Sequence, residues 1–343
     1  KRPTIAYQQW GKPNDDFSNV VWVCHALTGN TDVFDWWAGL FGEDSLFNSN
    51  DWCIICPNTI GSCYGSTGPL NINPASGAYY YGDFPEITIR DMANAHRLLA
   101  NQLGIQKMEV LIGGSLGGQQ ALEWSIIEPN KMKQLILVAT NAEHSAWGVA
   151  FNESQRQAIA TDSTWGQRHR EAGIKGLKVA RSIALLSYRS YEKYQESQQR
   201  DFIENGFSHP AISYQQYQGE KLAKRFNAYS YWTLSKAMDS HNVARNRVNL
   251  KAALAKISAK TLVIGIESDL LFPVQEQKLL AQFIPKAQFA EIKSAYGHDG
   301  FLVETKAIEK RIQDFLKNNY NQYKIIAFKP QNIIQPCKKT SEL

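Results

Sequence analysis

Continuous apolar runs of strand length recur along the chain, separated by stretches with helical spacing. The apolar runs occupy residues 19–24, 52–56, 107–112, 134–139, 260–266 and 287–293, and an alternating segment, 4–10, precedes them. Residues 88–103 have helical spacing instead, with Ile89, Met92 and Leu99 on one face and Gly104 as the stop. Strands that are apolar on both faces and alternate with helices predict an α/β fold, with a mainly parallel sheet flanked by helices.

The pattern changes between residues 141 and 249. This stretch has almost no β-rich runs, many Gln, Arg and Tyr residues, and helical periodicity at 176–191, 214–226 and 230–238. We therefore expect a helical cap domain, 141–249, inserted into a sheet-forming core made of 1–140 and 250–320. A final helix is expected at 301–318, and the polar segment 321–343 is interpreted as a loosely held C-terminal tail.

Composition narrows the class of protein. The 343 residues are 43% hydrophobic and 20% charged with a formal net charge of +5, which is ordinary for a soluble enzyme. Basic residues are spread along the chain, so we expect no nucleic-acid partner. No apolar run reaches the ~20 residues that span a bilayer. No secretory signal pattern is visible at the start, so we expect no membrane association and a cytoplasmic location.

The cysteines do not form a metal-binding pattern. Cys53 and Cys56 have the spacing of half a zinc site, but no second cysteine pair or histidine pair complements them. Their segment has the pattern of a core strand, so we interpret them as buried structural thiols. Reduced thiols fit the cytoplasm, and we expect no metal.

The first chemical signal is Gly113-Gly-Ser-Leu-Gly117, which joins an apolar strand to a predicted helix. A serine on a sharp strand-to-helix turn holds its hydroxyl clear of the sheet, and small neighbours permit the strained backbone. The string alone is weak evidence because it arises by chance. Its position between a strand and a helix indicates a nucleophile, Ser115.

A serine nucleophile needs a base, and that base needs an orienting acid. Glu267 and Asp269 are the first acids after strand 260–266, and His298 follows the next strand. Each lies beyond the carboxyl end of a strand, where open α/β sheets place their sites. We predict Ser115, Asp269 and His298 as a catalytic triad, and we interpret His25 as bracing a loop. A polar cluster without activity is the alternative.

Acyl transfer also needs donors for the developing oxyanion. The backbone N–H of Leu116 directly follows the nucleophile, and the loop at 25–29 fills the place of the second donor. We assign that donor to the N–H of Leu27.

Long ordered blocks covering about residues 5–318 resemble the homoserine O-acetyltransferase family. They are Cys24-His-Ala-Leu-Thr-Gly29, Trp36-Trp37, Gly61-Ser-Cys-Tyr-Gly-Ser-Thr-Gly-Pro69, Asn73-Pro74, Phe84-Pro-Glu-Ile-Thr-Ile-Arg-Asp-Met92, Gly113-Gly-Ser-Leu-Gly-Gly118, Ala121-Leu-Glu-Trp124, Phe151-Asn-Glu-Ser-Gln-Arg156, Ser268-Asp-Leu-Leu-Phe-Pro273 and Tyr296-Gly-His-Asp299. The resemblance implies an α/β-hydrolase fold. It also implies transfer of an acetyl group from acetyl-CoA to the hydroxyl of L-homoserine in methionine biosynthesis, by a homodimer with no bound cofactor.

The resemblance also implies residues for a zwitterionic acceptor. Arg181 corresponds to the arginine that binds the acceptor carboxylate, and Asp299 to the acid that binds its ammonium group. A solvated helix-face charge and a helix N-cap are the respective alternatives. The stretch 225–231 departs from the usual family sequence, and Leu116 replaces the usual Met, which bears on donor and acceptor specificity.

Several related activities stay open at this point. A succinyl donor and a serine acceptor both occur among related enzymes. An esterase or thioesterase would use the same triad with water as acceptor. A catalytically inactive binding protein is disfavoured because every triad position is filled.

Overall fold

A single sheet runs through the centre of the protein. The structure is a computed structural model that describes residues 3–199 and 209–317. Within them the sheet order is β1-β3-β2-β4-β5-β6-β7, and each neighbouring pair is parallel except β1 and β3. The strands are β1 (Tyr7–Trp10), β2 (Val20–Cys24), β3 (Cys53–Pro57), β4 (Met108–Gly114), β5 (Met132–Val138), β6 (Lys260–Ile266) and β7 (Ala287–Ile292). The mainly parallel α/β sheet expected from the apolar runs is confirmed.

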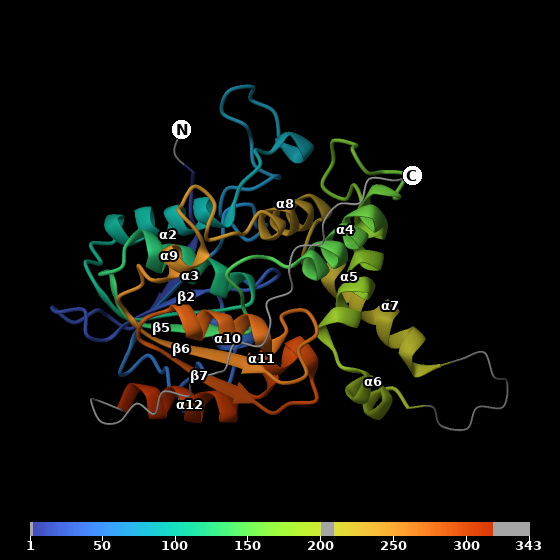
Figure 1. Ribbon diagram of the computed structural model, residues 1–343. Coiled ribbons are helices and arrows are strands. Elements are labelled where there is room, and N and C mark those ends of the chain that lie inside the picture. Colours follow the sequence, from blue (N-terminus) through green and yellow to red (C-terminus); the bar gives the residue numbers. More distant parts are fainter. Residues whose placement is uncertain (1–2, 200–208, 318–343) are drawn as a thin grey trace, which may run out of the picture.

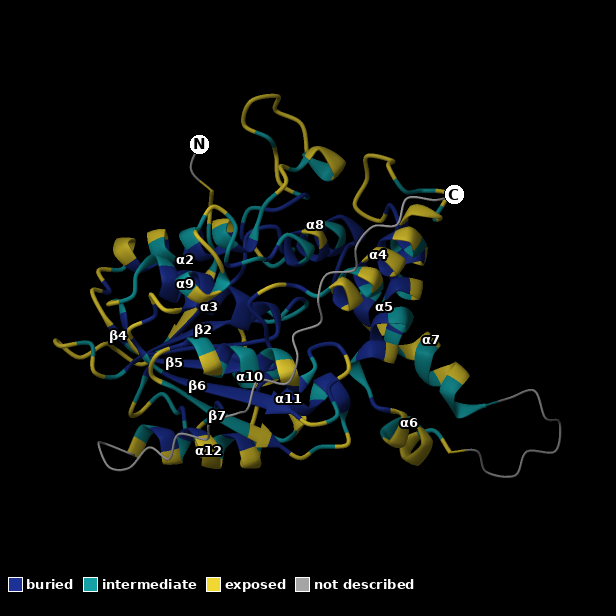
Figure 2. Cartoon of the chain, in the orientation of Figure 1, coloured by how far each residue is buried: buried dark blue, intermediate teal, exposed yellow. Residues whose placement is uncertain are grey.

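Helices cover both faces of this sheet (Figure 1). One core lies between the sheet and α2 (Ile89–Gln102), α3 (Leu116–Ile127), α9 (Leu250–Leu254) and α10 (Val274–Phe283). The other lies against α1 (Val33–Trp36), α11 (Gly300–Val303) and α12 (Thr305–Lys317). Trp22 faces the first core while Val21 and Val23 face the second, because successive strand residues point to opposite faces. Burial on both sides explains why the central strands β2 to β6 are mainly apolar (Figure 2).

The chain order reverses in the middle of the sheet, between β2 and β4. From β2 the chain continues outward to β3, whereas from β4 it continues in the other direction through β5 to β7. The loops that leave the two central strands therefore diverge and open a crevice at their carboxyl ends, where open α/β sheets bind ligands. His25 begins one of these loops and Ser115 ends the other.

Of the six described helices between β5 and β6, five lie beside the carboxyl edge of the sheet (Figure 1). They are α4 (Ala146–Ala160), α5 (Ile174–Tyr188), α6 (Tyr191–Ser197), α7 (Pro210–Ala223) and α8 (Ala228–Asp239). A third core joins them to the crevice, because Leu27 and Leu116 pack in the same cluster as Leu177 and Tyr231. The domain limits at residues 141 and 249 stay a prediction.

Some predicted helix boundaries differ from those in the structure. The expected helix at 301–318 is two helices, α11 and α12, which are separated by Glu304 at φ −81° and ψ 40°. Helix α7 begins at Pro210 rather than at residue 214, because His209 caps it and proline is well suited to the first turn. The proposed tail, 321–343, lies outside the described residues, as does Cys337.

Candidate active site

Ser115 occupies a strained turn between β4 and α3. Its φ of 56° and ψ of −127° lie in a region that residues with side chains rarely adopt. Two glycines make the turn possible: a Cβ on Gly113 would lie 2.2 Å from the Gly117 carbonyl oxygen, and a Cβ on Gly117 would lie 1.9 Å from the Cys24 carbonyl oxygen. The glycines of the motif are therefore required because backbone passes directly against backbone.

Three side chains that are distant in sequence meet at this turn. His298 Nε2 lies 2.9 Å from Ser115 Oγ, and His298 Nδ1 lies 2.6 Å from Asp269 Oδ2. All three residues are buried, with 3–5% of their surface exposed. The structure thus brings together the three residues predicted as the triad.

Asp269 is itself held in place by backbone amides. Its Oδ1 accepts hydrogen bonds from the N–H groups of Leu271 and Phe272, both at 2.9 Å. Its other oxygen is left to accept the Nδ1–H of His298, so Nε2 carries the lone pair that faces the Ser115 hydroxyl. The other acid considered, Glu267, is exposed. This arrangement can remove a proton from Ser115.

Aromatic rings enclose the imidazole of His298. The rings of Phe272, Phe301 and Tyr188 lie with their centroids 5.1, 5.2 and 5.7 Å from that of His298. Phe272 follows β6, Phe301 lies in α11, and Tyr188 ends α5 of the cap. The core and the cap therefore both restrict the orientation of the imidazole and its access to water.

The two residues predicted to supply oxyanion donors lie on adjacent backbone segments. Leu116 is the first residue of α3, where an N–H has no acceptor within the helix. Leu27 lies in the loop after β2, and Gln120 of α3 donates to the carbonyl oxygens of both His25 and Leu116, at 3.3 and 3.4 Å. This side chain holds the loop against the helix N-terminus.

His25 braces the same loop. The Thr59 N–H donates to its Nε2 at 3.0 Å, so the proton lies on Nδ1, which donates to the Ala26 carbonyl oxygen at 2.8 Å. Burial lowers the pKa of His25 to about 4, and the residue is neutral near pH 7. Both ring nitrogens are thus occupied by backbone, as expected for a structural role.

Arg181 lies in α5, next to the residues that surround His298. Its guanidinium carbon is 5.4 Å from the centroid of the Tyr188 ring, and Tyr188 in turn contacts the imidazole. The Arg181 Nε–H is buried and has no hydrogen-bond partner within the described residues. A buried, unpartnered guanidinium N–H is costly unless a ligand satisfies it.

Asp299 pairs with an arginine that the sequence analysis did not single out. Its carboxylate lies 2.8 Å from Arg189 Nε, and it makes no side-chain cap hydrogen bond to α11. Arg189 was missed by sequence reasoning. It directly follows α5, and its extended backbone, with φ −114° and ψ 152°, takes it out of the helical spacing of Arg181. No local pattern in the sequence identifies it.

A buried polar network links α10 to the serine turn. Thr140 Oγ1 donates to the Ser115 carbonyl oxygen at 2.8 Å, and Gln277 Nε2 donates to the Thr140 carbonyl oxygen at 2.7 Å. Beside them, Asn141 Nδ2 donates to Glu276 at 3.0 Å. Burial, and to a lesser extent the charge of Asp269, raise the pKa of Glu276 to about 7. Glu276 therefore titrates near neutral pH, which sequence reasoning did not anticipate.

The Glu276→Gln variant should unfold less readily than the wild type at pH 8. A carboxyl group whose pKa is raised by folding binds its proton more tightly in the folded state. The protein therefore loses stability as the pH rises from the ordinary pKa of a glutamate to about 7. We expect a gain of about 1–2 kcal/mol in the free energy of unfolding at pH 8 and little gain at pH 4.5, measured by urea denaturation. Glu267→Gln, at an exposed site, is the matched control. A gain that is equal at both pH values would contradict this explanation.

The cysteines agree with the structural interpretation. Cys53 and Cys56 lie on opposite faces of β3, one in each core, so they cannot bind one metal ion together. Cys24, Cys53, Cys56 and Cys63 are free thiols. Among the described residues no group of three or more His, Cys, Asp or Glu side chains could hold a metal ion.

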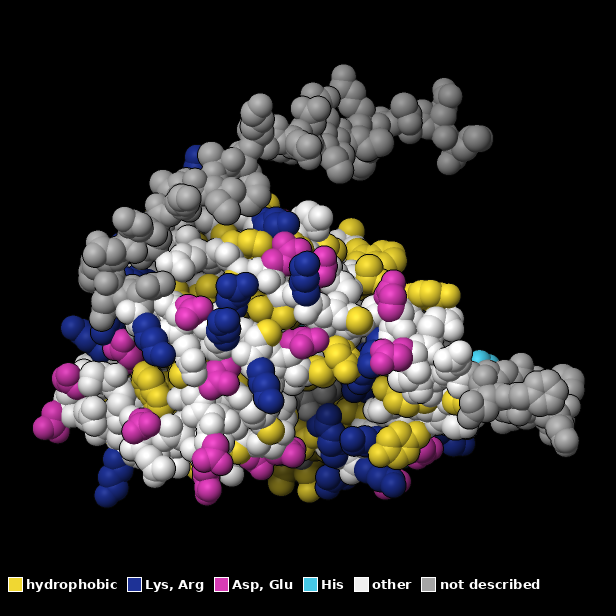
Figure 3. All heavy atoms as spheres, turned by 90° about the horizontal axis from the view of Figure 1, so that it is seen from below, with side chains coloured by type: hydrophobic (Ala, Val, Ile, Leu, Met, Phe, Trp, Pro, Cys, Tyr) yellow, Lys and Arg dark blue, Asp and Glu magenta, His cyan; other side chains and the backbone are white. Residues whose placement is uncertain are grey.

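On the face seen in Figure 3, neither positive nor negative side chains gather into one large patch. Lys and Arg side chains alternate there with Asp and Glu side chains and with apolar ones. Nucleic-acid binding requires a basic stripe or patch. Across residues 3–199 and 209–317, the helices are too short or too polar to cross a membrane.

Comparisons with known proteins assign the chain to a family. Residues 19–305 match the family model described as the alpha/beta hydrolase fold. A homoserine O-acetyltransferase from Cyclobacterium marinum is 46% identical over 92% of this chain and 90% of its own length. The crystal structure of homoserine O-acetyltransferase from Bacillus anthracis superposes with a TM-score of 0.84 at 25% identity, covering 93% of each chain.

A structure of esterase E22 also superposes, with a TM-score of 0.83 and 24% identity, over 92% of this chain and 94% of that one. At that identity the likeness concerns the fold alone. The long match to the Cyclobacterium marinum protein at 46% identity is far more specific. The chain belongs to the homoserine O-acetyltransferase family, within the α/β-hydrolase fold.

Proposed function

We propose that this protein transfers an acetyl group from acetyl-CoA to the side-chain hydroxyl of L-homoserine through an acyl-Ser115 intermediate. The observation that carries the proposal is the Ser115–His298–Asp269 relay beside Arg181, whose buried Nε–H lacks a partner within the described residues. A relay alone would serve any acyl acceptor. The cation beside it favours an acceptor that carries a carboxylate.

In the first step His298 Nε2 takes the Ser115 hydroxyl proton as Oγ attacks the thioester carbonyl carbon. The Leu27 and Leu116 N–H groups stabilise the oxyanion that forms on the carbonyl oxygen. The C–S bond then breaks, His298 returns the proton to the departing sulfur, and the acyl group stays on Ser115. Asp269 stabilises the imidazolium throughout, without becoming protonated itself.

In the second step the homoserine hydroxyl replaces CoA. His298 removes the hydroxyl proton as the oxygen attacks the acyl-serine carbonyl, and the proton passes to Ser115 Oγ when that ester bond breaks. Arg181 binds the acceptor carboxylate, and Asp299, within reach of Arg189, binds its ammonium group. Binding energy at these charged groups positions the hydroxyl at high effective concentration, which is how transfer exceeds hydrolysis.

Exclusion of water is supported by the packing over the serine. Ser115 and His298 are 5% and 3% exposed, and Leu27, Leu116 and Phe272 pack with cap residues in one cluster. Each acyl-enzyme lost to water wastes a thioester, so a buried serine suits a transferase. An esterase with the same relay would gain nothing from a charged acceptor site.

The direct test follows thiol release from acetyl-CoA and from succinyl-CoA, with homoserine, with serine and without an acceptor. We expect sustained release only with acetyl-CoA and homoserine together, and one equivalent per enzyme when no acceptor is present. Sustained release without an acceptor would identify a thioesterase. Absence of release with either thioester would identify an inactive binding protein.

Arg181→Ala should separate the two steps. Because Arg181 is assigned to the acceptor, we expect the KM for homoserine to rise by about tenfold or more. The burst of thiol from acetyl-CoA alone should keep its amplitude and rate, as measured by stopped flow. Lys175→Ala, at an exposed position in the same helix, is the control. Equal loss of both steps would refute the assigned role of Arg181.

We further propose that the protein acts in the cytoplasm as a homodimer, with no bound cofactor. Support for the location comes from the unpaired thiols, which suit a reducing compartment. Support for the dimer comes from large exposed apolar side chains on cap helices α5–α7, among them Leu186, Tyr191 and Tyr217. Sedimentation equilibrium distinguishes a dimer from a monomer.

A further inference from the structure

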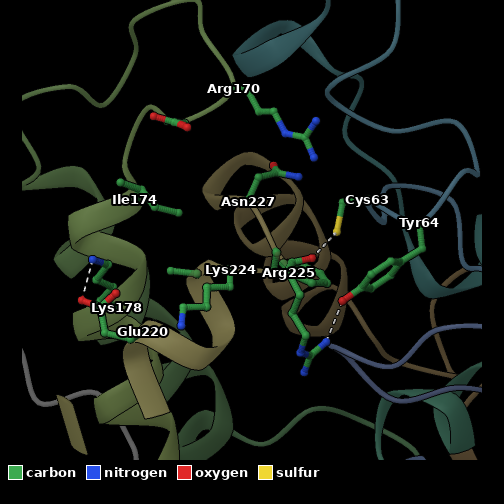
Figure 4. Close-up of a pocket in the computed structure, with 12 residues that line it drawn as sticks. Cys63, Tyr64, Arg170, Ile174, Lys178, Glu220, Lys224, Arg225 and Asn227 are labelled. Carbon is green, nitrogen blue, oxygen red and sulfur yellow. Dashed lines mark hydrogen bonds and ion pairs between the residues drawn. The ribbon is translucent and has the colours of Figure 1, made fainter. Parts of the chain in front are cut away.

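A cavity of about 540 Å³ opens between the cap and the loop that follows β3. Helices α5 and α7, the segment 170–171 before α5 and the turn 224–227 after α7 form its cap side, and Cys63 and Tyr64 form the other side (Figure 4). The cavity is not lined by Ser115, His298 or Asp269, nor by the residues assigned to the acceptor. The cavity therefore has no role in the chemistry described so far.

The cavity carries an excess of positive charge. Four basic residues line it, against the two acids Glu171 and Glu220; the basic residues are Arg170, Lys178, Lys224 and Arg225. Lys178 and Glu220 form an ion pair at 2.6 Å and neutralise each other. The side chains of Arg170 and Lys224 have no hydrogen-bond or ion-pair partner within residues 3–199 and 209–317. Two cations are thus available to an anionic ligand.

Arg225 also contributes uncompensated charge. Its guanidinium donates to the Thr28 carbonyl oxygen at 2.6 Å and to the Tyr64 hydroxyl at 2.7 Å, and both acceptors are neutral. Asn227, which caps the N-terminus of the twelve-residue helix α8, lies on the cavity wall as well. The positive end of that helix adds to the attraction for an anion.

Two sets of contacts connect the cavity to the catalytic residues. Arg225 binds Thr28, which directly follows Leu27 in the oxyanion loop. The ring of Phe226, on the cavity wall, contacts the ring of Tyr231 with centroids 6.3 Å apart, and Tyr231 interacts with Tyr188 beside His298. The wall of the cavity is thus linked through direct contacts to the oxyanion loop and to the surroundings of His298.

We propose that this cavity holds the phosphate groups of CoA while the thioester arm extends to Ser115. The inference rests on the proposed function, which makes a CoA thioester the donor. Acetyl-CoA is an extended molecule with a thioester at one end and an adenosine with a 3′-phosphate and a 5′-diphosphate at the other. Guanidinium and ammonium groups without internal partners are the chemistry that binds phosphates. A smaller ester substrate would have no use for them.

The first test compares acetyl-CoA with acetyl-pantetheine, which keeps the thioester arm but lacks both the phosphates and the adenosine. The double variant Arg170→Ala with Lys224→Ala should lower kcat/KM for acetyl-CoA by roughly tenfold or more, through KM. With acetyl-pantetheine as donor, the rate of the same variant should stay within about twofold of the wild-type rate with that donor. Lys221→Ala, on α7 but outside the cavity, should behave as wild type with both donors, and Lys224→Arg should retain most of the affinity. Equal effects on both donors, or no effect on either, would overturn the proposal.

The second test does not depend on turnover. Calorimetry on the Ser115→Ala protein, with and without the two cavity substitutions, measures binding of adenosine 3′,5′-bisphosphate and of inorganic phosphate. We expect the bisphosphate to bind at least tenfold more tightly than inorganic phosphate. Its affinity should fall in the protein that carries the two cavity substitutions. Absence of binding, equal binding of inorganic phosphate, or binding unchanged by the substitutions would each overturn the inference. These results stand even if acetyl-CoA and homoserine prove not to be substrates, so failure of the proposed function is recognised separately.

Discussion

Ser115→Ala is expected to abolish the acyl-enzyme burst and to lower kcat for acyl transfer by about 10⁴-fold or more. The relay of Ser115, His298 and Asp269 acts as a unit, so removal of the nucleophile leaves only binding and oxyanion stabilisation, which give small residual rates. The measurement is single-turnover release of thiol from acetyl-CoA.

A matched serine on the same helix provides the control. Ser125 is buried in α3, and its hydroxyl donates only to the Leu122 carbonyl oxygen, at 2.8 Å. Ser125→Ala should keep the burst. Survival of the burst in folded Ser115→Ala protein would show that another residue carries the acyl group.

Gly117→Ala should prevent the protein from folding, or cost at least about 4 kcal/mol in the free energy of unfolding. The added Cβ would lie 1.9 Å from the Cys24 carbonyl oxygen, and both partners are backbone in the centre of the molecule. Relief would require α3 to move away from the loop after β2. That movement would separate Leu116 from the loop that carries Leu27, so any folded fraction should also lose acylation rate.

Gly82→Ala is the control for glycine replacement. Gly82 is exposed in the short 3₁₀ helix Tyr81–Asp83, and a Cβ there would have its nearest neighbour, the Tyr229 ring, at 3.8 Å. We expect a change within about 0.5 kcal/mol, measured by thermal and urea denaturation. Wild-type stability of Gly117→Ala would contradict the close approach of α3 to β2.

The parts of the fold that could be predicted are those determined by local pattern. Strand β6, Lys260–Ile266, begins and ends where the apolar run does, because burial on both faces makes the whole strand apolar. Ser115, Asp269 and His298 could be chosen because each follows such a strand. The break between α11 and α12 could not be predicted, because the apolar spacing continues through Glu304 while the backbone there leaves the helical region.

The residues that sequence reasoning missed depend on contacts between distant segments. Arg189 acquires its role by meeting Asp299, 110 positions later in the chain. Burial and the charge of Asp269 raise the pKa of Glu276, while the hydrogen bond from Asn141 opposes them, and no local pattern encodes any of these contacts. Likewise, the sequence does not distinguish Arg170 and Lys224 from other surface charges, because only the fold of the cap places them in one cavity.

The pairing of Asp299 with Arg189 affects how the acceptor site should be understood. The family resemblance predicted one cation and one anion for the acceptor, whereas the structure places Arg181, Arg189 and Asp299 together near His298. An Asp299 already in contact with Arg189 is held in one position before the acceptor arrives. Such preorganisation lowers the ordering cost of binding.

The central claim is that Ser115 carries an acetyl group from CoA to an amino-acid hydroxyl, and a labelled chase tests it most directly. The enzyme is mixed with acetyl-CoA labelled in the acetyl group, freed of excess donor, and examined by intact-protein and peptide mass spectrometry. We predict one labelled acetyl group on the peptide containing Ser115, stable in buffer and transferred to O-acetylhomoserine when homoserine is added. Label that leaves equally fast with and without homoserine, or that resides on another residue, would contradict the account.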